Sequence, residues 1–190
     1  ALSTCVMDGL NKIGVRATHS DGSGLGALKF GMPLPWEGDF DVCVHKHDSQ
    51  TFKAKFKKVT AYCTEATGKA VRDTMDINVA SGLLSHVDFF TPLGTKAHVY
   101  VCGDQLGGSS WKTTGRTTSM RFCGRWLNTE LNPAAFHRSK FGHSFRHAES
   151  WILGSNSAWL YTKFGFSNCS ETFRGHNACL KGLIDGDLSA

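Results

Sequence analysis

Charged residues are scarce in this 190-residue chain, at 19% of the composition, and several familiar motifs are missing altogether. No apolar run approaches the roughly 18 residues that a membrane-spanning helix needs, so we expect no membrane span. The absence of a Cys-x-x-Cys pair argues against a zinc ribbon, and the absence of Gly-x-Ser-x-Gly argues against a serine hydrolase. No repeat or low-complexity tract is visible. These absences leave an ordinary globular fold as the expectation.

The chain has enough apolar residues for one packed core. Hydrophobic residues make up 41% of it and aromatic residues 11%, over a length typical of one domain. From about residue 154 the sequence becomes rich in glycine, serine and asparagine, which predicts a loop-rich tail. We therefore expect residues 1–190 to form a single domain that ends in such a tail.

The net charge of +5 is modest, and part of it is concentrated between about residues 49 and 66. There, Phe52, Phe56 and Val59 recur at helical spacing between lysines, which predicts an amphipathic helix with a basic outer face. Such a face is either a solvated helix surface or a patch that binds phosphate or an acidic polysaccharide. Nucleic acid is a poor candidate partner, because no aromatic and basic motif of the known binding modules is present.

Seven cysteines favour an oxidising compartment, since thiols in the cytosol are normally free or bound to metal. The sequon Asn168-Cys169-Ser170 is a candidate glycosylation site and also suits a secreted or secretory-pathway protein. We expect disulfides, with Cys169 and Cys179 closing a local loop. An odd number leaves at least one thiol free or available for a disulfide-linked dimer. The seven are Cys5, Cys43, Cys63, Cys102, Cys123, Cys169 and Cys179.

The most informative feature is a pair of carboxylates at the start of a β-like run. Asp39 and Asp41 stand at positions i and i+2, so a strand projects both to one face, while Phe40 and Val42 point to the other. Neighbouring carboxylates repel one another unless protons or a cation intervene, and their oxygens suit Mg²⁺, Mn²⁺ or Ca²⁺. The simpler alternative is a polar strand edge after a turn.

Two further segments favour the ligand-binding interpretation. The run from Asp21 to Lys29 is a glycine-rich turn that leads into helix-favouring residues, an arrangement that exposes backbone N–H groups to an anion. Its spacing matches neither a Walker A loop nor a dinucleotide fingerprint, and a flexible loop is the alternative. Asp88 lies in a second β-like run and offers a third carboxylate. If the two strands are neighbours, the three aspartates converge.

Histidines follow the same strands. His45 and His47 continue the acidic face of the Asp39 strand, and His86 shares the face of Asp88, so all three are candidates for the rim of the same cavity. Each is otherwise an ordinary surface or hydrogen-bonded histidine. His143 and His147 stand one helical turn apart, as zinc ligands often do, but without the glutamate of the metalloprotease motif.

The periodicity predicts a mixed α+β fold. A first helix is expected from Ser3 or Thr4 to Lys12, and a late helix from Asn132-Pro133 to Phe141. Between them lie the basic helix and several extended runs, most of them separated by turn signals. The runs are expected at about residues 15–19, 39–46, 70–79, 83–90, 97–102 and 118–127.

The chain contains, in this order, Gly22-Ser23, Leu25-Gly26-Ala27, Lys29, Pro35-Trp36, Asp39 and Asp41. This run resembles the first motif of the LicD/fukutin-type proteins, which have the nucleotidyltransferase fold. The element Val87-Asp88-Phe89-Phe90 is similar to the family's Val-Asp-Ile/Phe-Phe segment, and residues 132–142 are a weaker echo of a later one. The resemblance covers about residues 5 to 145 and implies a mixed or antiparallel sheet flanked by helices, here with disulfides.

The resemblance implies a metal-dependent transferase that moves a phosphate-linked group from a nucleotide donor, such as CDP-choline or CDP-ribitol, to a glycan hydroxyl. Asp39 and Asp41 would hold Mg²⁺ or Mn²⁺ against the donor phosphates, and Asp88 would complete the site and help to deprotonate the acceptor. Gly22 and Ser23 would bind phosphate through backbone N–H groups, and Lys29, where the family usually has arginine, would neutralise developing charge.

The alternative is a catalytically silent, secreted carbohydrate-binding or defence protein that uses the same acidic site for Ca²⁺ and sugar hydroxyls. Glu37-Gly38 stands where the family has paired acids, which favours this alternative. Both hypotheses predict that Asp39, Asp41 and Asp88 lie on adjacent strands within reach of one cation. Metal preference separates the two, because the enzyme would respond to Mg²⁺ or Mn²⁺ with nucleotide and the lectin to Ca²⁺ or to no metal.

Overall fold

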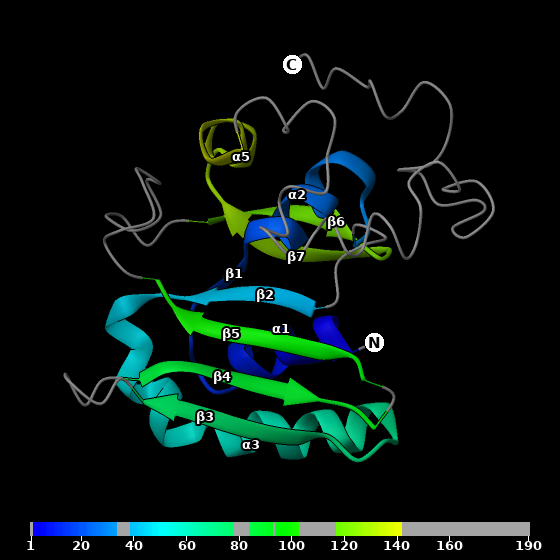
Figure 1. Ribbon diagram of the computed structural model, residues 1–190, viewed down its shortest axis with the longest axis vertical. Helices are drawn as coiled ribbons and strands as arrows, with labels where there is room; N and C mark the ends of the chain where they lie inside the picture. Colours follow the sequence, from blue (N-terminus) through cyan, green and yellow to red (C-terminus); the bar gives the residue numbers. More distant parts are fainter. Residues whose placement is uncertain (1, 34–38, 78–83, 93, 103–116, 142–190) are drawn as a thin grey trace, which may run out of the picture.

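The computed structural model, shown in Figure 1, describes residues 2–33, 39–77, 84–92, 94–102 and 117–141. A five-stranded mixed sheet forms its centre, in the order β1-β2-β5-β4-β3. β2 and β5 are parallel, and the other neighbouring strands are antiparallel, which confirms the predicted mixed sheet. The strands are β1 (Ala17–His19), β2 (Asp39–Val44), β3 (Arg72–Ile77), β4 (Leu84–Phe90) and β5 (Lys96–Val101).

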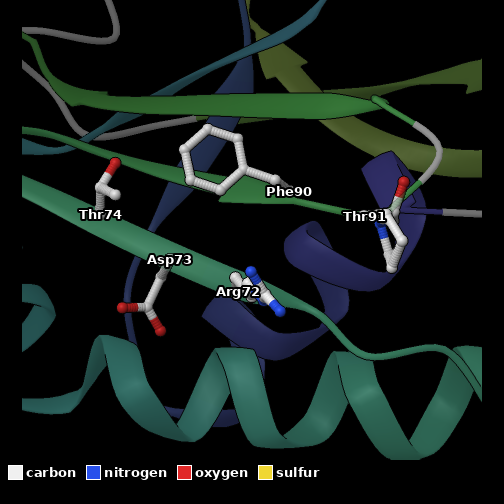
Figure 2. A pocket seen from close by; sticks show the side chains of 6 residues that line it. Arg72, Asp73, Thr74, Phe90 and Thr91 are labelled. Atoms are coloured by element: carbon white, nitrogen blue, oxygen red, sulfur yellow. The ribbon is translucent and has the colours of Figure 1, made fainter.

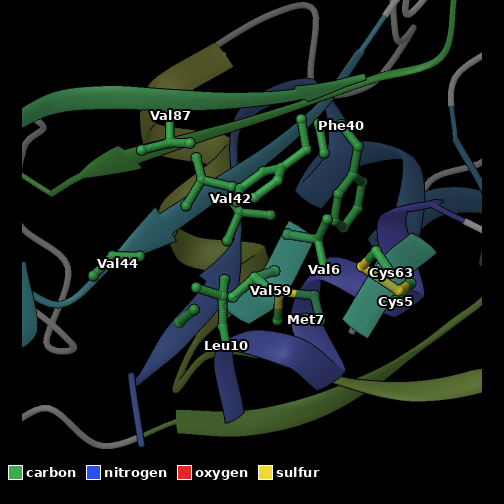
Figure 3. Packing of buried hydrophobic residues seen from close by; sticks show 14 of the residues in the cluster. Cys5, Val6, Met7, Leu10, Phe40, Val42, Val44, Val59, Cys63 and Val87 are labelled. Carbon is green, nitrogen blue, oxygen red and sulfur yellow. A yellow bond between two sulfur atoms is a disulfide. The ribbon is translucent and has the colours of Figure 1, made fainter. Parts of the chain in front are cut away.

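Two helices, α1 (Leu2–Lys12) and α3 (Ser49–Thr67), cover the apolar face of this sheet (Figure 1). Alternation along β2 buries Phe40, Val42 and Val44 in the same cluster as residues from both helices. Figure 3 shows Val6 of α1 among these strand residues. The amphipathic helix predicted around residues 49–66 is confirmed, and its buried stripe is Phe52, Phe56, Val59 and Cys63.

A second layer lies beside β1 and contains α2 (Asp21–Phe30), the hairpin β6 (Thr117–Phe122) and β7 (Arg125–Glu130), and α5 (Pro133–Phe141). The single extended run expected at 118–127 is two strands. Cys123 and Gly124 have φ values of 50° and 79°, so they form the tight two-residue turn that reverses the chain. Asn132 begins α5 as predicted, because its Oδ1 accepts a hydrogen bond from the Ala135 N–H at 3.1 Å.

The glycine-rich segment predicted as a turn is helical from Asp21 onward, and α2 ends at Gly31 in the left-handed conformation. Close packing explains the glycine at position 24. A Cβ there would lie 2.5 Å from Nε2 of His137 in α5, so only glycine lets the two helices approach this closely. The local sequence signal for a loop is therefore overridden by the packing of α2 against α5.

Two cysteine pairs lie at disulfide distance. Cys5 and Cys63 join α1 to α3 with their Cα atoms 5.5 Å apart (Figure 3), and Cys43 and Cys102 join β2 to the end of β5 with Cα atoms 5.4 Å apart. Cys123 is exposed and has no disulfide partner among the described residues. The sequon at Asn168 and the expected pair Cys169 and Cys179 lie outside the described part of the chain.

One hydrophobic cluster runs from Leu2 to Leu127 and includes both layers, through the buried Phe122. Phe122 packs on Phe40 of the central sheet, with ring centroids 5.2 Å apart. The cluster is consistent with the expected single domain, which stays a prediction for residues 1–190. The tail expected from about residue 154 lies outside the described residues. Among the described helices, none combines the length and the apolar character that crossing a membrane requires.

Two buried histidines beside α2 make the fold sensitive to acid. Burial lowers the pKa of His19 to about 4 and that of His137 to about 3. Between these values and 6.5 the unfolded chain binds more protons than the folded one, so the free energy of unfolding falls as the pH falls. We expect it to be a few kcal/mol lower at about pH 4.5 than at about pH 7, since each pKa unit contributes about 1.4 kcal/mol.

Urea unfolding at the two pH values measures this difference. His19→Gln should reduce the pH dependence, because it removes one of these groups. Burial also lowers the pKa of His45, which therefore contributes in the same direction. Asp48 also has a lowered pKa, mainly through its hydrogen bond with Arg16, but its contribution is lost only below its ordinary value of 3.8, outside this window. Equal stability at both pH values would show that the folded chain binds as many protons as the unfolded one, so that burial does not keep the two histidines uncharged.

Candidate functional site

The face of the sheet opposite α1 and α3 is polar. Asp41 of β2 pairs in register with His98 of β5, and His98 pairs in turn with Asp88 of β4. Asp39 pairs with Lys96. Because directly opposed residues share a face, the three predicted aspartates lie on one side of the sheet, together with two residues of β5.

The strands that carry the aspartates are not adjacent, which corrects the expectation from the sequence. β5 lies between β2 and β4 and forms hydrogen-bonded ladders with both. β4 and β5 are consecutive antiparallel strands, and it is β5 that joins β2 in parallel. With neighbouring strands about 4.8 Å apart, the backbones at Asp41 and Asp88 are separated by about 10 Å.

Lys96 of β5 lies between two of the three carboxylates. Its Nζ is 3.1 Å from Oδ2 of Asp39 and 3.8 Å from Oδ2 of Asp88. All three side chains are partly exposed, at 34% for Lys96, 30% for Asp39 and 15% for Asp88. Two carboxylates from non-adjacent strands therefore meet at one positively charged group, and side chains from both strands reach across β5 to the same position.

Two histidines also lie next to the Asp88 carboxylate. Nδ1 of His98 lies 2.6 Å from Oδ1 of Asp88, and Nε2 of His86 lies 3.8 Å from Oδ2. The two imidazole centroids are 4.6 Å apart. The structure thus places His86 beside Asp88, as its sequence position predicts, and adds His98.

The expectation that His45 and His47 rim the same cavity is corrected. β2 ends at Val44, and the chain turns into the short 3₁₀ helix η1 (Lys46–Asp48), so the alternation of the strand does not continue. His45 is 3% exposed, and its Nδ1 accepts from the His47 N–H at 3.4 Å. Both histidines lie near Asp48, at the end of β2 remote from Asp39.

The first turn of α2 is tied to the acidic strand. The Asp41 N–H donates to Oγ of Ser23 at 2.9 Å, and the Ser20 N–H donates to the Asp41 carbonyl at 3.0 Å. Ser23 is 1% exposed, so its hydroxyl fixes the helix to β2. Gly22 is the preceding residue of this buried turn. Lys29 lies in the last turn of α2, about 9 Å farther along the helix axis, and its side chain is outside the described part.

Tyr100 connects β5 to the same helix start. Its hydroxyl donates to Oγ of Ser20 at 2.9 Å and also contacts the Asp21 carboxylate. Burial is the main cause that raises the pKa of Tyr100, and the charges of Asp41 and Glu130 raise it further. The phenol therefore stays a hydrogen-bond donor at physiological pH, which fixes the start of α2 relative to the polar face.

A pocket of about 590 Å³ adjoins this face at the β3–β4 edge (Figure 2). Phe90 stands opposite Lys96 in register and Thr74 opposite Asp88, so both belong to the face of the aspartates. Asp73 points the other way in Figure 2, toward α3, where it contacts Lys57. The lining consists of Arg72, Asp73, Thr74, Phe90, Thr91 and Pro92.

The sequence interpretation missed the residues that β5 contributes. Lys96, His98 and Tyr100 alternate strictly with apolar residues, which is the signal of a strand with one polar face. That alternation gives the face of each residue. It does not tell which strands β5 separates, and the position of Lys96 between two aspartates follows only from the strand order.

The family model described as LicD/FKTN/FKRP, nucleotidyltransferase domain, matches residues 14–101. This segment begins just before β1 and ends with β5, so it contains the whole five-stranded sheet and all three aspartates. A search of curated proteins gives no match. The resemblance seen in the sequence is therefore confirmed over residues 14–101, which are similar to the nucleotidyltransferase domain of the LicD/fukutin family.

Proposed function

We propose that this chain is a metal-dependent transferase that moves a phosphate-linked group from a nucleotide donor to a hydroxyl of a glycan. The family supports a phosphotransferase-type enzyme. The observation that carries the proposal is the polar face itself, on which Asp39 and Asp88 both lie within 4 Å of one ammonium nitrogen. Asp41 shares that face and is bonded through its backbone to the start of α2.

The residues present fit a divalent cation. Carboxylate oxygens are the ligands that Mg²⁺ and Mn²⁺ prefer, and Asp39 and Asp88 already approach a common positive charge. Asp39 and Asp41 would hold the ion, and Asp88 would complete the set. When bound, the ion supplies positive charge that offsets the donor phosphates.

The remaining groups position the reactants. The backbone N–H groups of Gly22 and Ser23 bind a donor phosphate, which requires the buried first turn of α2 to open. Lys29 offsets negative charge as it develops. Asp88 accepts the proton of the acceptor hydroxyl, and its bond to His98 fixes the orientation of the carboxylate. A new bond then forms between the acceptor oxygen and phosphorus, while the bond from phosphorus to the departing nucleotide breaks.

The pocket at the β3–β4 edge suits the acceptor. Arg72 and Thr74 offer hydrogen-bond donors to sugar hydroxyls, and Phe90 offers an apolar surface for a sugar ring. The pocket lies on the Asp88 side of the face, where the proton of the acceptor is to be removed. Both features agree with a glycan acceptor at this edge.

A screen of nucleotide-linked donors and free sugars against each divalent metal tests the proposal. We expect release of nucleoside monophosphate from a CDP-linked donor when Mg²⁺ or Mn²⁺ and a glycan acceptor are present. Binding of free sugar that depends on Ca²⁺ or on no metal, together with indifference to every nucleotide donor, would contradict transfer.

One observation favours the alternative of a silent, secreted carbohydrate-binding protein. Lys96 already bridges Asp39 and Asp88, so part of their negative charge is offset without any metal. Lys96→Met separates the two functions. In a lectin-like protein that binds sugar without metal, the loss of this ammonium alters sugar binding directly, whereas in a transferase it changes the Mg²⁺ or Mn²⁺ concentration needed for turnover. A secreted location is part of either proposal, and the cysteine pairs Cys5–Cys63 and Cys43–Cys102 support it.

A further inference from the structure

We propose that His86, Asp88 and His98 form a binding site for a transition-metal ion such as Zn²⁺ or Co²⁺, which shares Asp88 with the proposed oxygen set of Asp39, Asp41 and Asp88 but adds two imidazole nitrogens. One potential ligand atom from each of the three lies within 4.8 Å of the others. The site does not depend on transferase activity, because metal binding itself is the property inferred.

The geometry is close to that of a bound ion. Ligand atoms around a tetrahedral Zn²⁺ lie about 3.4 Å apart, since each bond is about 2.1 Å long. Nδ1 of His98 and Oδ1 of Asp88 are 2.6 Å apart, and Nε2 of His86 is 3.8 Å from Oδ2 of Asp88. These two distances run to different oxygens of Asp88, and one ligand atom from each residue lies within 4.8 Å of the others. The side chains must therefore rotate to bring the three ligand atoms to coordination distance.

The orientation of His86 supports the same conclusion. Its Nδ1 faces Oγ of Ser85 at 3.4 Å and Oδ2 of Asp76 at 3.8 Å. The other ring nitrogen of His86, Nε2, therefore faces Asp88. Metal-binding histidines commonly direct one ring nitrogen to a carboxylate or hydroxyl and the other to the ion, which fixes the tautomer and strengthens the ligand.

The ligand chemistry selects the kind of metal. Two imidazole nitrogens and one carboxylate suit zinc, cobalt, nickel and iron better than magnesium or calcium, which prefer oxygen. His86 and His98 are 28% and 27% exposed, and Asp88 is 15% exposed. Three protein ligands on a partly open face leave at least one coordination position for water or for a ligand atom.

The positive charge of Lys96 disfavours a metal ion at this site, because the Lys96 Nζ lies 3.8 Å from Oδ2 of Asp88. Its nearer partner is Asp39, at 3.1 Å. When a metal ion occupies the site beside Asp88, the ammonium retains Asp39, so the two positive charges need not share one carboxylate. Asp39 and Lys96 thus remain together while Asp88 turns to the histidines.

Metal titration of the full chain tests the site, after a chelator has removed bound metal. Co²⁺ binding is followed by its visible absorption and Zn²⁺ binding by calorimetry, both without nucleotide. We expect one equivalent of either metal to bind at this site. His86→Ala and His98→Ala should each weaken binding at least about tenfold, while the exposed His47→Ala serves as the matched control and leaves it unchanged.

A double variant, His143→Ala with His147→Ala, tests the other histidine pair in the sequence. If this variant loses the Zn²⁺ equivalent and His86→Ala keeps it, the inferred site is overturned. Failure of the wild-type chain to bind Zn²⁺ or Co²⁺ overturns it as well. A thermal melt of each variant verifies folding. If His98→Ala does not fold, the metal affinity of His86→Ala alone tests the site. The test measures metal binding and not transferase activity. Its result is therefore independent of the result for the proposed function.

Discussion

Asp41→Asn is expected to abolish metal-dependent transfer while leaving the fold intact. The substitution keeps the shape of the side chain and removes a negative charge from the proposed ion-binding pair on β2. Loss of one preorganised charged or polar group at a reacting centre commonly costs about 10²- to 10³-fold in turnover. Stability should be unchanged or slightly higher without metal, since neighbouring carboxylates repel one another. Initial rates of donor turnover across a Mn²⁺ titration measure the effect.

Asp8→Asn is the matched control. Asp8 is in α1, on the other side of the sheet, and its partly exposed carboxylate is 2.8 Å from Arg125. Loss of such a pair costs about 1 kcal/mol or less and should not affect turnover. A melting temperature several degrees lower for Asp41→Asn than for the wild type, without metal, would show that Asp41 is structural. Unchanged turnover in this variant would remove Asp41 from the site.

Removal of the Cys5–Cys63 disulfide is expected to be the most destabilising change outside the site. The bond joins α1 to α3 across 58 residues of sequence. Fixing a loop of that length restricts the unfolded chain, which in the chain-entropy model stabilises the fold by about 4 kcal/mol. We expect Cys5→Ala with Cys63→Ala to lower the free energy of urea unfolding by an amount of this order. Both cysteines are buried, so the loss of packed sulfur adds to the effect.

Cys123→Ser provides the comparison, because Cys123 is exposed at a hairpin turn and has no disulfide partner among the described residues. Its substitution should change stability by about 0.5 kcal/mol or less. If the double alanine variant unfolds at the same urea concentration as the wild type, the Cys5–Cys63 bond is absent in solution. The oxidising compartment inferred from the cysteines would then lose its main support.

Most secondary-structure elements follow from local sequence signals. The stripe of Phe52, Phe56 and Val59 places α3, and the alternation around Asp39 places β2, because helices and strands impose different periods on buried residues. The signals fail where packing between distant segments decides. The glycine-rich run at Asp21 looks like a loop, yet it is helical, since His137 in α5 needs the space that Gly24 leaves.

The site could be predicted only in part for a similar reason. Strand alternation correctly places Asp39, Asp41 and Asp88 on the polar face, since it depends on local geometry alone. Which strand lies between β2 and β4 is a property of the whole sheet, and no local pattern contains it. The bridging role of Lys96 and the meeting of His98 with Asp88 depend on that order.

An anomalous diffraction measurement on crystals soaked with Mn²⁺ and a CDP-linked donor addresses the acidic face directly. We predict a manganese peak at about 2.2 Å from carboxylate oxygens of Asp39 and Asp41, a typical distance for a divalent ion with oxygen ligands, and in contact with a donor phosphate. A manganese ion found only beside His86, Asp88 and His98, or a donor bound away from β2, would contradict the assignment of this face as the transfer site.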